Sequence, residues 1–431
     1  MLRKLCLPIR FASSSAAIGH AFDTVSRTNQ SYVDRYSQVG TFNYKPLPVV
    51  VERGKGIYLW DVEGKQYFDF LSSFSSINQG HCHPRLVEVM KNQIETLTLT
   101  ASGAFHNNMV ADYFEYMTEL FGYQRILAMN TGVEAVDTAI KLARRWAYDI
   151  KKVPKNEARI IFAKMNFHGR SITGVSASTD LNARSGYGPF VSNFDVIPFN
   201  DVKALERVIA NPNNAAFVFE PIQGEGGIVI PDDGYLQKVR ELCTKHNVLM
   251  VADEIQTGLG RTGRMLACDH ESVRPDIVTL SKSLSGGMYP VSAVLADDEI
   301  MLLLKTGQHG STYAANPLAC RIAIEALQVI IDEKLCENAE TMGNLLRHEL
   351  SKPNFKCATT IRGKGLLTGI VIHPNVSSQE ICAKLASKGL LAKDTQGHII
   401  RLAPPLIIKE NELRQAASII TETLSEFEKY V

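Results

Sequence analysis

The stretch DIVTLSKSLSGGMYPVSAVL, residues 276–295, holds a single lysine in an otherwise apolar and small-residue passage. Residues 277–280 predict a short buried strand, and residues 285–287 predict a sharp turn after it. Lys282 lies between them. Burial removes water from an ammonium group and favours the neutral amine, which attacks carbonyls and forms Schiff bases. The alternative is a lysine whose stem packs while its charged head reaches solvent.

Two earlier predicted strands, NAAFVFEPIQ (214–223) and NVLMVADEIQTG (247–258), also end in polar residues. A helix predicted over 233–246 separates these two strands, and such alternation predicts a mostly parallel sheet covered on both faces. Ligands bind such sheets at the carboxyl ends of the strands. The polar residues at the three strand ends are Glu220, Gln223, Asp253, Gln256 and Lys282. Caps and turns explain one such end more easily than three.

A glycine, Gly132, stands between a strand predicted at 126–129 and a helix with apolar residues at helical spacing. Glycine lets the backbone approach a ligand closely, and the first amides of a helix point toward anions. Gly132 and Val133 therefore form a candidate phosphate site. An ordinary helix N-terminus capped by Thr131 would have the same sequence.

Asp253 precedes Lys282 by 282 − 253 = 29 residues, about one crossover between neighbouring parallel strands. The two side chains can therefore face one pocket. An ionised aspartate keeps a pyridinium nitrogen protonated, and a lysine forms an imine with the aldehyde of the same ring. These are the two protein groups that a pyridoxal phosphate enzyme requires.

Length and composition describe an ordinary globular chain. Its 431 residues predict two or three domains. With 45% hydrophobic and 21% charged residues and a net charge of +1, it has no electrostatic reason to bind nucleic acid or an anionic membrane. No apolar run approaches the roughly 20 residues that span a bilayer. We therefore expect a soluble protein with a small polar ligand.

The cysteine pattern indicates neither a disulfide framework nor a metal site. The eight cysteines are scattered and form no C-x-x-C pair. His81-Cys82-His83 resembles a metal motif, but adjacent residues cannot all turn to one ion without strain. We expect a turn before Pro84 instead, and no bound metal.

The first 22 residues contain Arg3, Lys4 and Arg10, several serines and no acid before Asp23. This composition is typical of a mitochondrial transit peptide. The alternative is a disordered N-terminus of a cytoplasmic protein. We expect three further regions: an N-terminal segment packing with the small domain, a large cofactor-binding domain and a C-terminal small domain, at residues 23–70, 71–315 and 316–431.

Several motifs together resemble one enzyme family. VADEIQTGLGRTG (251–263) followed by LSKSLSGGMYPVSAVL (280–295) looks like the signature of class III, fold-type I aminotransferases. Further motifs, in their order along the chain, are similar to those of the ornithine branch of that family. They are FDFLSS-S-NQGHCHP, MNTGVEA, NFHGR, EPIQGEGG, GSTYAANP and IIRLAPPL. The resemblance runs from Tyr44 to the C-terminus and implies a large domain with a mostly parallel seven-stranded sheet and a smaller α+β domain.

The resemblance also implies roles for individual residues around pyridoxal 5'-phosphate. Lys282 would be the Schiff-base lysine and proton shuttle, and Asp253 would pair with the pyridine nitrogen. The other implied contacts are Gln256 to the phenolic oxygen, Phe167 stacked on the ring, and Gly132 and Val133 to the phosphate. Ser311 and Thr312 would reach the neighbouring subunit's cofactor, which implies a homodimer.

The implied reaction moves the terminal amine of ornithine to 2-oxoglutarate. Arg170, with Tyr44 nearby, would bind the ornithine carboxylate. Because 2-oxoglutarate brings two carboxylates, a second arginine, Arg401, is required. Glu225 would neutralise Arg401 while ornithine is bound. Taken without the resemblance, a structural ion pair is the better explanation for each arginine.

Two positions depart from the family pattern. Phe74 stands where ornithine enzymes commonly carry a substrate-contacting tyrosine, and His168 stands where a tryptophan is often found. Losing the tyrosine hydroxyl removes a hydrogen bond worth about 1 kcal/mol. N-acetylornithine or 4-aminobutyrate therefore remain alternative donors. A catalytically silent binding relative is the alternative from another class of protein.

Overall fold

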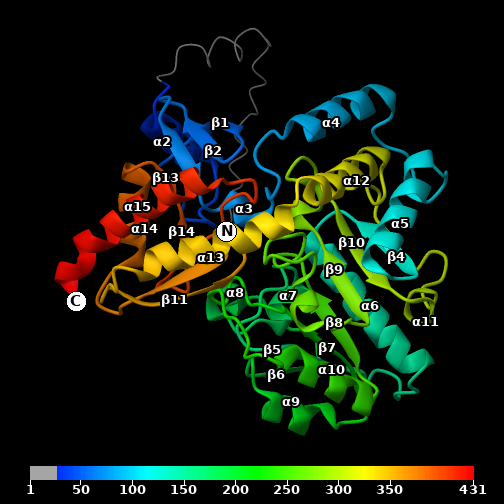
Figure 1. Ribbon diagram of the computed structural model, residues 1–431. Helices are drawn as coiled ribbons and strands as arrows, with labels where there is room; N and C mark the ends of the chain where they lie inside the picture. Colours follow the sequence, from blue (N-terminus) through cyan, green and yellow to red (C-terminus); the bar gives the residue numbers. More distant parts are fainter. Residues whose placement is uncertain (1–26) are drawn as a thin grey trace, which may run out of the picture. The chain divides into compact units, whose positions relative to one another are not determined.

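The computed structural model describes residues 27–431 (Figure 1). The predicted transit segment, residues 1–22, lies outside these residues. The described chain divides into two compact units: an N-terminal unit of residues 27–53 and 59–66, and a large unit of residues 54–58 and 67–431. The domain boundaries expected at 70 and 315 stay predictions. No helix among the described residues is both long enough and apolar enough to span a bilayer.

The N-terminal unit contains one helix, α2 (Asn29–Val39), which begins with a capping box. Thr28 accepts the amide hydrogen of Ser31, as such a box requires. The Asn29 side chain accepts from the amide of Val50 at 2.6 Å and donates to Asp61 at 3.0 Å. Asn29 therefore ties the helix to both chain segments of this unit.

The large unit is built on a seven-stranded sheet in the order β4-β10-β9-β8-β7-β5-β6 (Figure 1). The strands from β9 to β6 run parallel, and β10 is antiparallel to both β4 and β9. The predicted mostly parallel seven-stranded sheet is confirmed. The strands are β4 (Arg125–Met129), β5 (Arg159–Ala163), β6 (Phe194–Ile197), β7 (Asn214–Phe219), β8 (Leu249–Asp253), β9 (Ile277–Leu280) and β10 (Ser292–Ala296).

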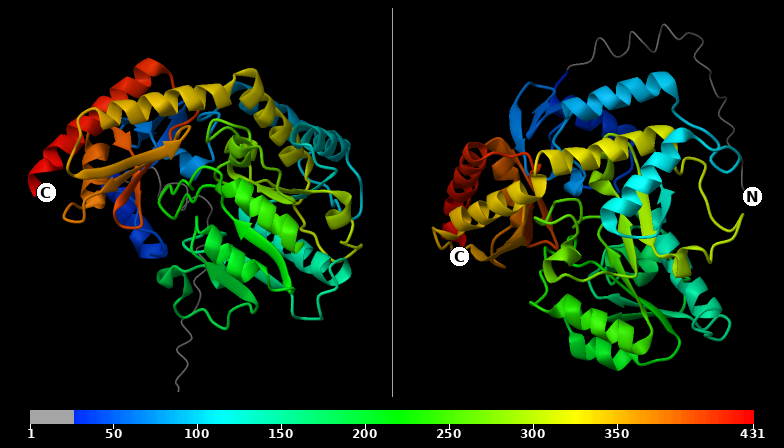
Figure 2. Two further views of the ribbon diagram at one scale, coloured as in Figure 1. Left: turned by 60° about the horizontal axis from the view of Figure 1, so that its bottom comes forward. Right: turned by 45° about the vertical axis from the view of Figure 1, so that its right-hand side comes forward.

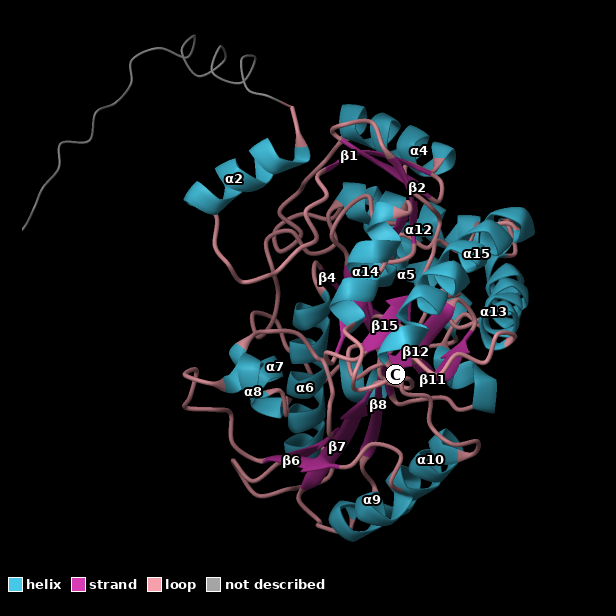
Figure 3. Ribbon diagram, turned by 90° about the vertical axis from the view of Figure 1, so that its left-hand side faces the viewer, coloured by secondary structure: helices cyan, strands magenta, loops and turns pink. Residues whose placement is uncertain are grey.

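Alternating side chains of the strands bury the two faces of this sheet against different helices. Ile160 and Phe162 pack with α6 (Gly132–Asp149), whereas Ile161 packs with α9 (Val202–Ile209) and α10 (Tyr235–His246). In Figure 3, α6 lies on one side of β6, β7 and β8, and α9 and α10 lie on the other. Helices α5 (Asn108–Phe121) and α12 (Pro317–Asp332) cover the β4 end.

The C-terminal part contains another sheet, which is antiparallel and has the order β11-β12-β15-β14. A short strand, β13, pairs in parallel with β3 through Leu390 and Phe68. The C-terminal elements are α13 (Leu335–Ser351), β11 (Ala358–Lys364), β12 (Leu367–Ile372), α14 (Ser378–Ser387), β13 (Leu390–Leu391), β14 (Lys393–Thr395), β15 (Ile399–Leu402) and α15 (Glu410–Phe427).

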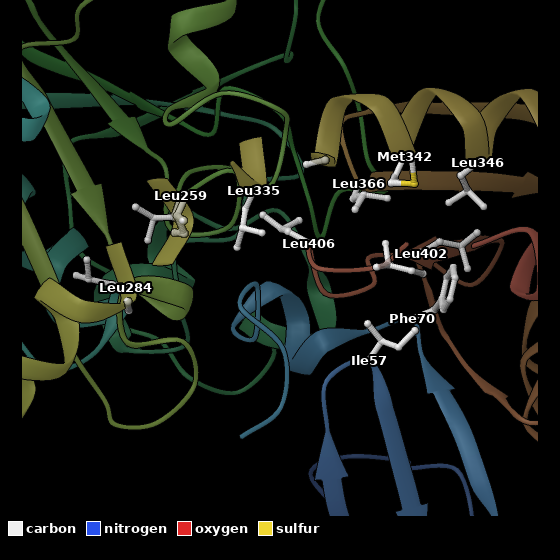
Figure 4. Packing of buried hydrophobic residues seen from close by; sticks show 14 of the residues in the cluster. Ile57, Phe70, Leu259, Leu284, Leu335, Met342, Leu346, Leu366, Leu402 and Leu406 are labelled. Atoms are coloured by element: carbon white, nitrogen blue, oxygen red, sulfur yellow. The ribbon is translucent and has the colours of Figure 1, made fainter. Parts of the chain in front are cut away.

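The long helical pattern predicted after Pro317 is divided into α12 and α13 (Figure 2). The break falls at Lys334, whose backbone is left-handed with φ +52°. The apolar spacing continues on both sides of this residue, so hydrophobic periodicity does not reveal the break. Apolar side chains from both sheets then form one continuous core, in which Leu284 and Leu259 are followed by Leu335 and Leu406 (Figure 4).

In sequence, β1 to β3, a left-handed turn and α4 precede the seven-stranded sheet. The turn, α3 (Ser72–Ser75), has four consecutive non-glycine residues with positive φ. The remaining elements are β1 (Val51–Lys55), β2 (Tyr58–Asp61), β3 (Gln66–Asp69), α4 (Pro84–Thr96), α7 (Ile172–Ala177), α8 (Leu181–Arg184), α11 (Asp298–Met301) and the 3₁₀ turns Ala267–Glu271, Lys282–Ser285 and Glu428–Tyr430.

The histidines of the His81-Cys82-His83 motif contact different partners. His81 Nε2 lies 2.6 Å from Asp69, and His83 Nε2 lies 3.0 Å from Glu333. Cys82 is left-handed with φ 51°, and His83 precedes the first residue of α4. This is the turn that the sequence predicts before Pro84.

Candidate active site

A cavity of about 210 Å³ lies at the carboxyl ends of β7, β8 and β9. It brings together four of the five polar residues that follow these strands: Glu220, Asp253, Gln256 and Lys282. The fifth, Gln223, instead donates to the carbonyl of Lys164 at 2.8 Å. The lining residues are Gly132, Val133, Phe167, His168, Gly169, Glu220, Glu225, Asp253, Ile255, Gln256, Thr257, Ser281 and Lys282.

Lys282 begins the 3₁₀ turn that follows β9, and its own backbone is left-handed with φ 49°. The turn is fixed from outside by Gln79, which donates to the carbonyl of Ser283 at 3.2 Å and to that of Ala326 at 2.9 Å. Burial lowers the pKa of the Lys282 amine to about 8, against a smaller opposing effect of Glu225. A usable fraction of this amine is therefore neutral near physiological pH.

Asp253 ends β8 beside Lys282 and is held through both carboxylate oxygens. Oδ2 lies 2.7 Å from His168 Nδ1, and Oδ1 accepts from the amide of Ile255 at 3.2 Å and from Thr279 Oγ1 at 3.3 Å. Asp253 is 4% exposed and His168 is 2% exposed. A buried carboxylate in a fixed orientation therefore faces the cavity.

The amino end of α6 borders the same cavity through Gly132 and Val133. Thr131 caps the helix, and Glu134 completes a capping box with it. The amides of Gly132 and Val133 belong to the first turn, where helical amides have no intrahelical partner. A Cβ on Gly132 would lie 3.0 Å from Ile255, so glycine also permits the close packing of this turn.

Glu225 and Arg401 form an ion pair at the cavity, with 2.6 Å between Oε1 and Nη1. Burial would raise the pKa of Glu225, but Arg401 lowers it below its ordinary value. Arg401, on β15, is 1% exposed, and its guanidinium lies 4.8 Å from the ring centre of Phe74. The Glu225 carbonyl accepts from Thr395 at 2.8 Å and from Gln396 at 2.9 Å. The backbone of Glu225 is thus fixed to the sheet that carries Arg401.

Residues 39–424 match the family model of class III aminotransferases, described as "Aminotransferase class-III". This match covers most of the chain. The chain belongs to the class III aminotransferases.

Individual relatives agree with this assignment. The mitochondrial ornithine aminotransferase of Rattus norvegicus is 59% identical over 396 residues, which cover 91% of this chain and 90% of that protein. The crystal structure of ornithine aminotransferase from Toxoplasma gondii ME49 superimposes with a TM-score of 0.94 at 43% identity, covering 96% and 99% of the two chains. Acetylornithine aminotransferase from Elizabethkingia anophelis matches with a TM-score of 0.85 at 47% identity, covering 93% and 100%.

The pocket of this aminotransferase fits pyridoxal 5'-phosphate. The two groups that the cofactor requires, a lysine and an aspartate, lie in one cavity with the amino end of α6. Gln256 contributes a buried side-chain oxygen, Oε1, that has no hydrogen-bond partner among the described residues. A polar group of a ligand would satisfy it. Phe167 also lines the cavity, where a planar ring can stack on it.

Other predicted residues lie outside this lining. Arg170 lines a small neighbouring pocket together with Phe167 and Glu225, and its guanidinium lies 5.9 Å from the Phe167 ring centre. Ser311 Oγ accepts from Asn130, next to the amino end of α6, at 2.8 Å. Thr312 follows it in an exposed turn. Tyr44 belongs to the N-terminal unit and is exposed, and its place near a substrate stays a prediction.

The structure adds contacts that the sequence did not predict. His168 bonds directly to Asp253, although the sequence identified it only as a departure from the family pattern. The contact of Phe74 with Arg401 and the two bonds to the Glu225 carbonyl also join segments that lie far apart in the chain. No local pattern could indicate these contacts, because the residues of each pair meet only when distant segments of the chain pack together.

Proposed function

We propose that this protein is an ornithine 5-aminotransferase: it transfers the δ-amino group of L-ornithine to 2-oxoglutarate, giving glutamate 5-semialdehyde and L-glutamate in a ping-pong cycle. The observation that carries the proposal is the Glu225–Arg401 pair beside Lys282. A buried arginine that is neutralised by a partly accessible carboxylate provides a carboxylate site that can be closed for one substrate and opened for the other.

The two substrates differ in the charge that they bring to this arginine. Ornithine reacts through its terminal amine and presents its single carboxylate elsewhere, toward Arg170, so Arg401 is best neutralised by Glu225. 2-Oxoglutarate has two carboxylates and needs both arginines. Hydrogen bonds fix the Glu225 backbone. Arg401 is therefore released by rotation of the Glu225 side chain, while its guanidinium stays against Phe74.

The residues of the pocket divide the chemical work. Bound pyridoxal phosphate supplies the electron sink that makes the proton on the reacting carbon acidic. Lys282 offers an amine at Nζ that accepts and returns this proton, which the low pKa of about 8 favours. Asp253 keeps the ring nitrogen protonated, and the Gly132 and Val133 amides hold the phosphate. Phe167 and Gln256 orient the ring.

A second candidate is another ω-aminotransferase that takes N-acetylornithine or 4-aminobutyrate. Phe74 favours this candidate because it lacks a hydroxyl at the position where ornithine enzymes commonly have a tyrosine. The likeness to the acetylornithine aminotransferase from Elizabethkingia anophelis is consistent with it. Ornithine remains our proposal, because the curated relative at 59% identity is an ornithine aminotransferase.

Half-reaction rates with ornithine, N-acetylornithine and 4-aminobutyrate on the same preparation test the donor. We expect ornithine to be the fastest of the three, and a faster reaction with either alternative would overturn the proposal. Glu225→Ala should raise the rate with glutamate and lower that with ornithine, because Arg401 is then permanently free. Unchanged rates for both amino acids in this variant would remove Glu225 from the mechanism.

We further propose a homodimer in the mitochondrial matrix. Ser311 and Thr312 lie in a turn beside the amino end of α6, and they would reach the phosphate of the partner's cofactor. The rat relative is named as mitochondrial, and Arg3, Lys4 and Arg10 give the N-terminus of this chain a matching composition. A cytoplasmic protein is the alternative. Import of the full chain into isolated mitochondria, with shortening of the N-terminus, tests this location.

A further inference from the structure

His168 occupies a buried position directly behind Asp253. It belongs to the loop that follows β5, and its ring packs against Phe162 with 5.6 Å between ring centres. Its Nδ1 lies 2.7 Å from Asp253 Oδ2 and makes the shortest of the bonds to this carboxylate. His168 therefore does most to fix the orientation of Asp253.

Glu220 adds a second carboxylate to this buried group. One of its oxygens accepts from the Phe167 amide at 3.0 Å, and the other accepts from the Gly224 amide at 3.3 Å. The opposite ring nitrogen of His168, Nε2, is buried and has no partner among the described residues. The loop is thus held at two adjacent residues, Phe167 by Glu220 and His168 by Asp253.

The charges within this group depend on one another. Burial alone would lower the pKa of His168, but its bond to Asp253 and the nearby Glu220 raise it above its ordinary value. Burial raises the pKa of Glu220 to about 7, which His168 opposes and Asp253 reinforces. Asp253 and Glu220 are the two carboxylates acting on His168, and Phe162 covers it from β5. The bond to Asp253 and the nearby Glu220 therefore favour the protonated form of the His168 ring.

We infer that His168 is a positioning residue that acts through Asp253 to set the orientation and the charge of the group facing the cofactor's ring nitrogen. This inference rests on the proposed cofactor site. An imidazolium behind Asp253 offsets the negative charge that the carboxylate brings into the cavity. Removing the histidine leaves a carboxylate that is freer to rotate and a cavity that is more negative.

Three variants separate the effect of the His168 hydrogen bond on the position of Asp253 from the effect of the His168 charge. His168→Leu removes both the hydrogen bond and the charge. His168→Asn keeps a donor near the place of Nδ1 but carries no charge. His83→Leu is the matched control, because His83 is also a buried histidine bonded to a carboxylate, that of Glu333, outside the cavity. Each variant is titrated with pyridoxal phosphate, and the absorbance of the bound cofactor is followed against pH without substrate.

We expect His168→Leu to weaken cofactor binding by about 10- to 100-fold, as loss of a hydrogen bond to a charged group does. Its absorbance midpoint should move to higher pH, because a more negative cavity favours the protonated form. His168→Asn should recover most of the affinity and keep the shifted midpoint. His83→Leu should change neither. Unchanged affinity and midpoint in His168→Leu would overturn the inference.

The same histidine substitution in the Asp253→Ala variant excludes a general loss of folding as the cause. In Asp253→Ala, the further change His168→Leu should have little effect on cofactor affinity, because the histidine acts through the carboxylate. Equal effects in both backgrounds would show a merely structural role and overturn the inference. Failure of the wild-type protein to bind pyridoxal phosphate would instead refute the proposed cofactor site, so the two failures are distinguishable.

Discussion

Asp253 and Lys282 meet because β8 and β9 are neighbouring parallel strands. Asp253 pairs with Thr279 in the register of these strands, and Lys282 follows three residues later. The spacing of one crossover predicts this meeting, because parallel neighbours bring their carboxyl ends to the same edge of a sheet. The orientation of Asp253, by contrast, depends on His168, which comes from another loop.

The low pKa of Lys282 leads to a prediction for the cofactor-free protein. Below pH 8 the lysine is charged in both the folded and the unfolded state, and the folded state bears the cost of burying the charge. Between about pH 8 and its ordinary pKa of 10.5, only the unfolded state binds the proton, so stability attributable to this residue rises with pH. Lys282→Met should therefore raise the melting temperature at pH 7 by a few degrees.

This gain should shrink when melting temperatures are compared at pH 10, because the folded wild-type protein then holds a neutral amine. Lys141→Met on α6 is a suitable control, because the Lys141 amine is exposed and donates to the carbonyl of Gln308 at 3.1 Å. An equal gain at both pH values would contradict the predicted titration of Lys282.

At the scale of single elements, the left-handed turn α3 carries Phe74 to Arg401. Left-handed backbone costs non-glycine residues roughly 1–2 kcal/mol each, and Ser73 and Phe74 have φ values of 47° and 60°. The Phe74 ring contacts the guanidinium in return, a contact worth about 0.5–2 kcal/mol. Local strain in this turn therefore coincides with a contact at the candidate substrate site.

Ser73→Gly should raise the free energy of unfolding by up to about 1 kcal/mol, because glycine adopts positive φ without strain. Ser73 is exposed, so few contacts are lost. Ser418→Gly, at an exposed position inside α15, should instead lower it by a similar amount. Denaturant unfolding of both variants checks the opposite signs, and a loss of stability in Ser73→Gly would contradict the strained turn.

At the scale of the whole molecule, the proposed dimer places Thr312 of one subunit at the cofactor of the other. A mixed dimer of Lys282→Ala and Thr312→Ala subunits would then contain one site with both changes and one site with neither. Lys282→Ala is expected to be inactive and Thr312→Ala to bind the cofactor more weakly, so coexpression should restore cofactor affinity and activity at up to one intact site in each mixed dimer. A mixed preparation with no more activity than the Thr312→Ala variant alone would show that Lys282 and Thr312 serve the same subunit's site.

Sequence by itself determined the alternation of strands and helices, the polar strand ends at Asp253 and Lys282, and the glycine at the amino end of α6, because these signals are local or lie one crossover apart. The short and partly buried strand β6 carried too weak a pattern to be predicted. Only the tertiary structure decided that His168 supports Asp253 and that Phe74 covers Arg401. Their positions depend on packing between distant segments, which hydrophobic periodicity does not encode.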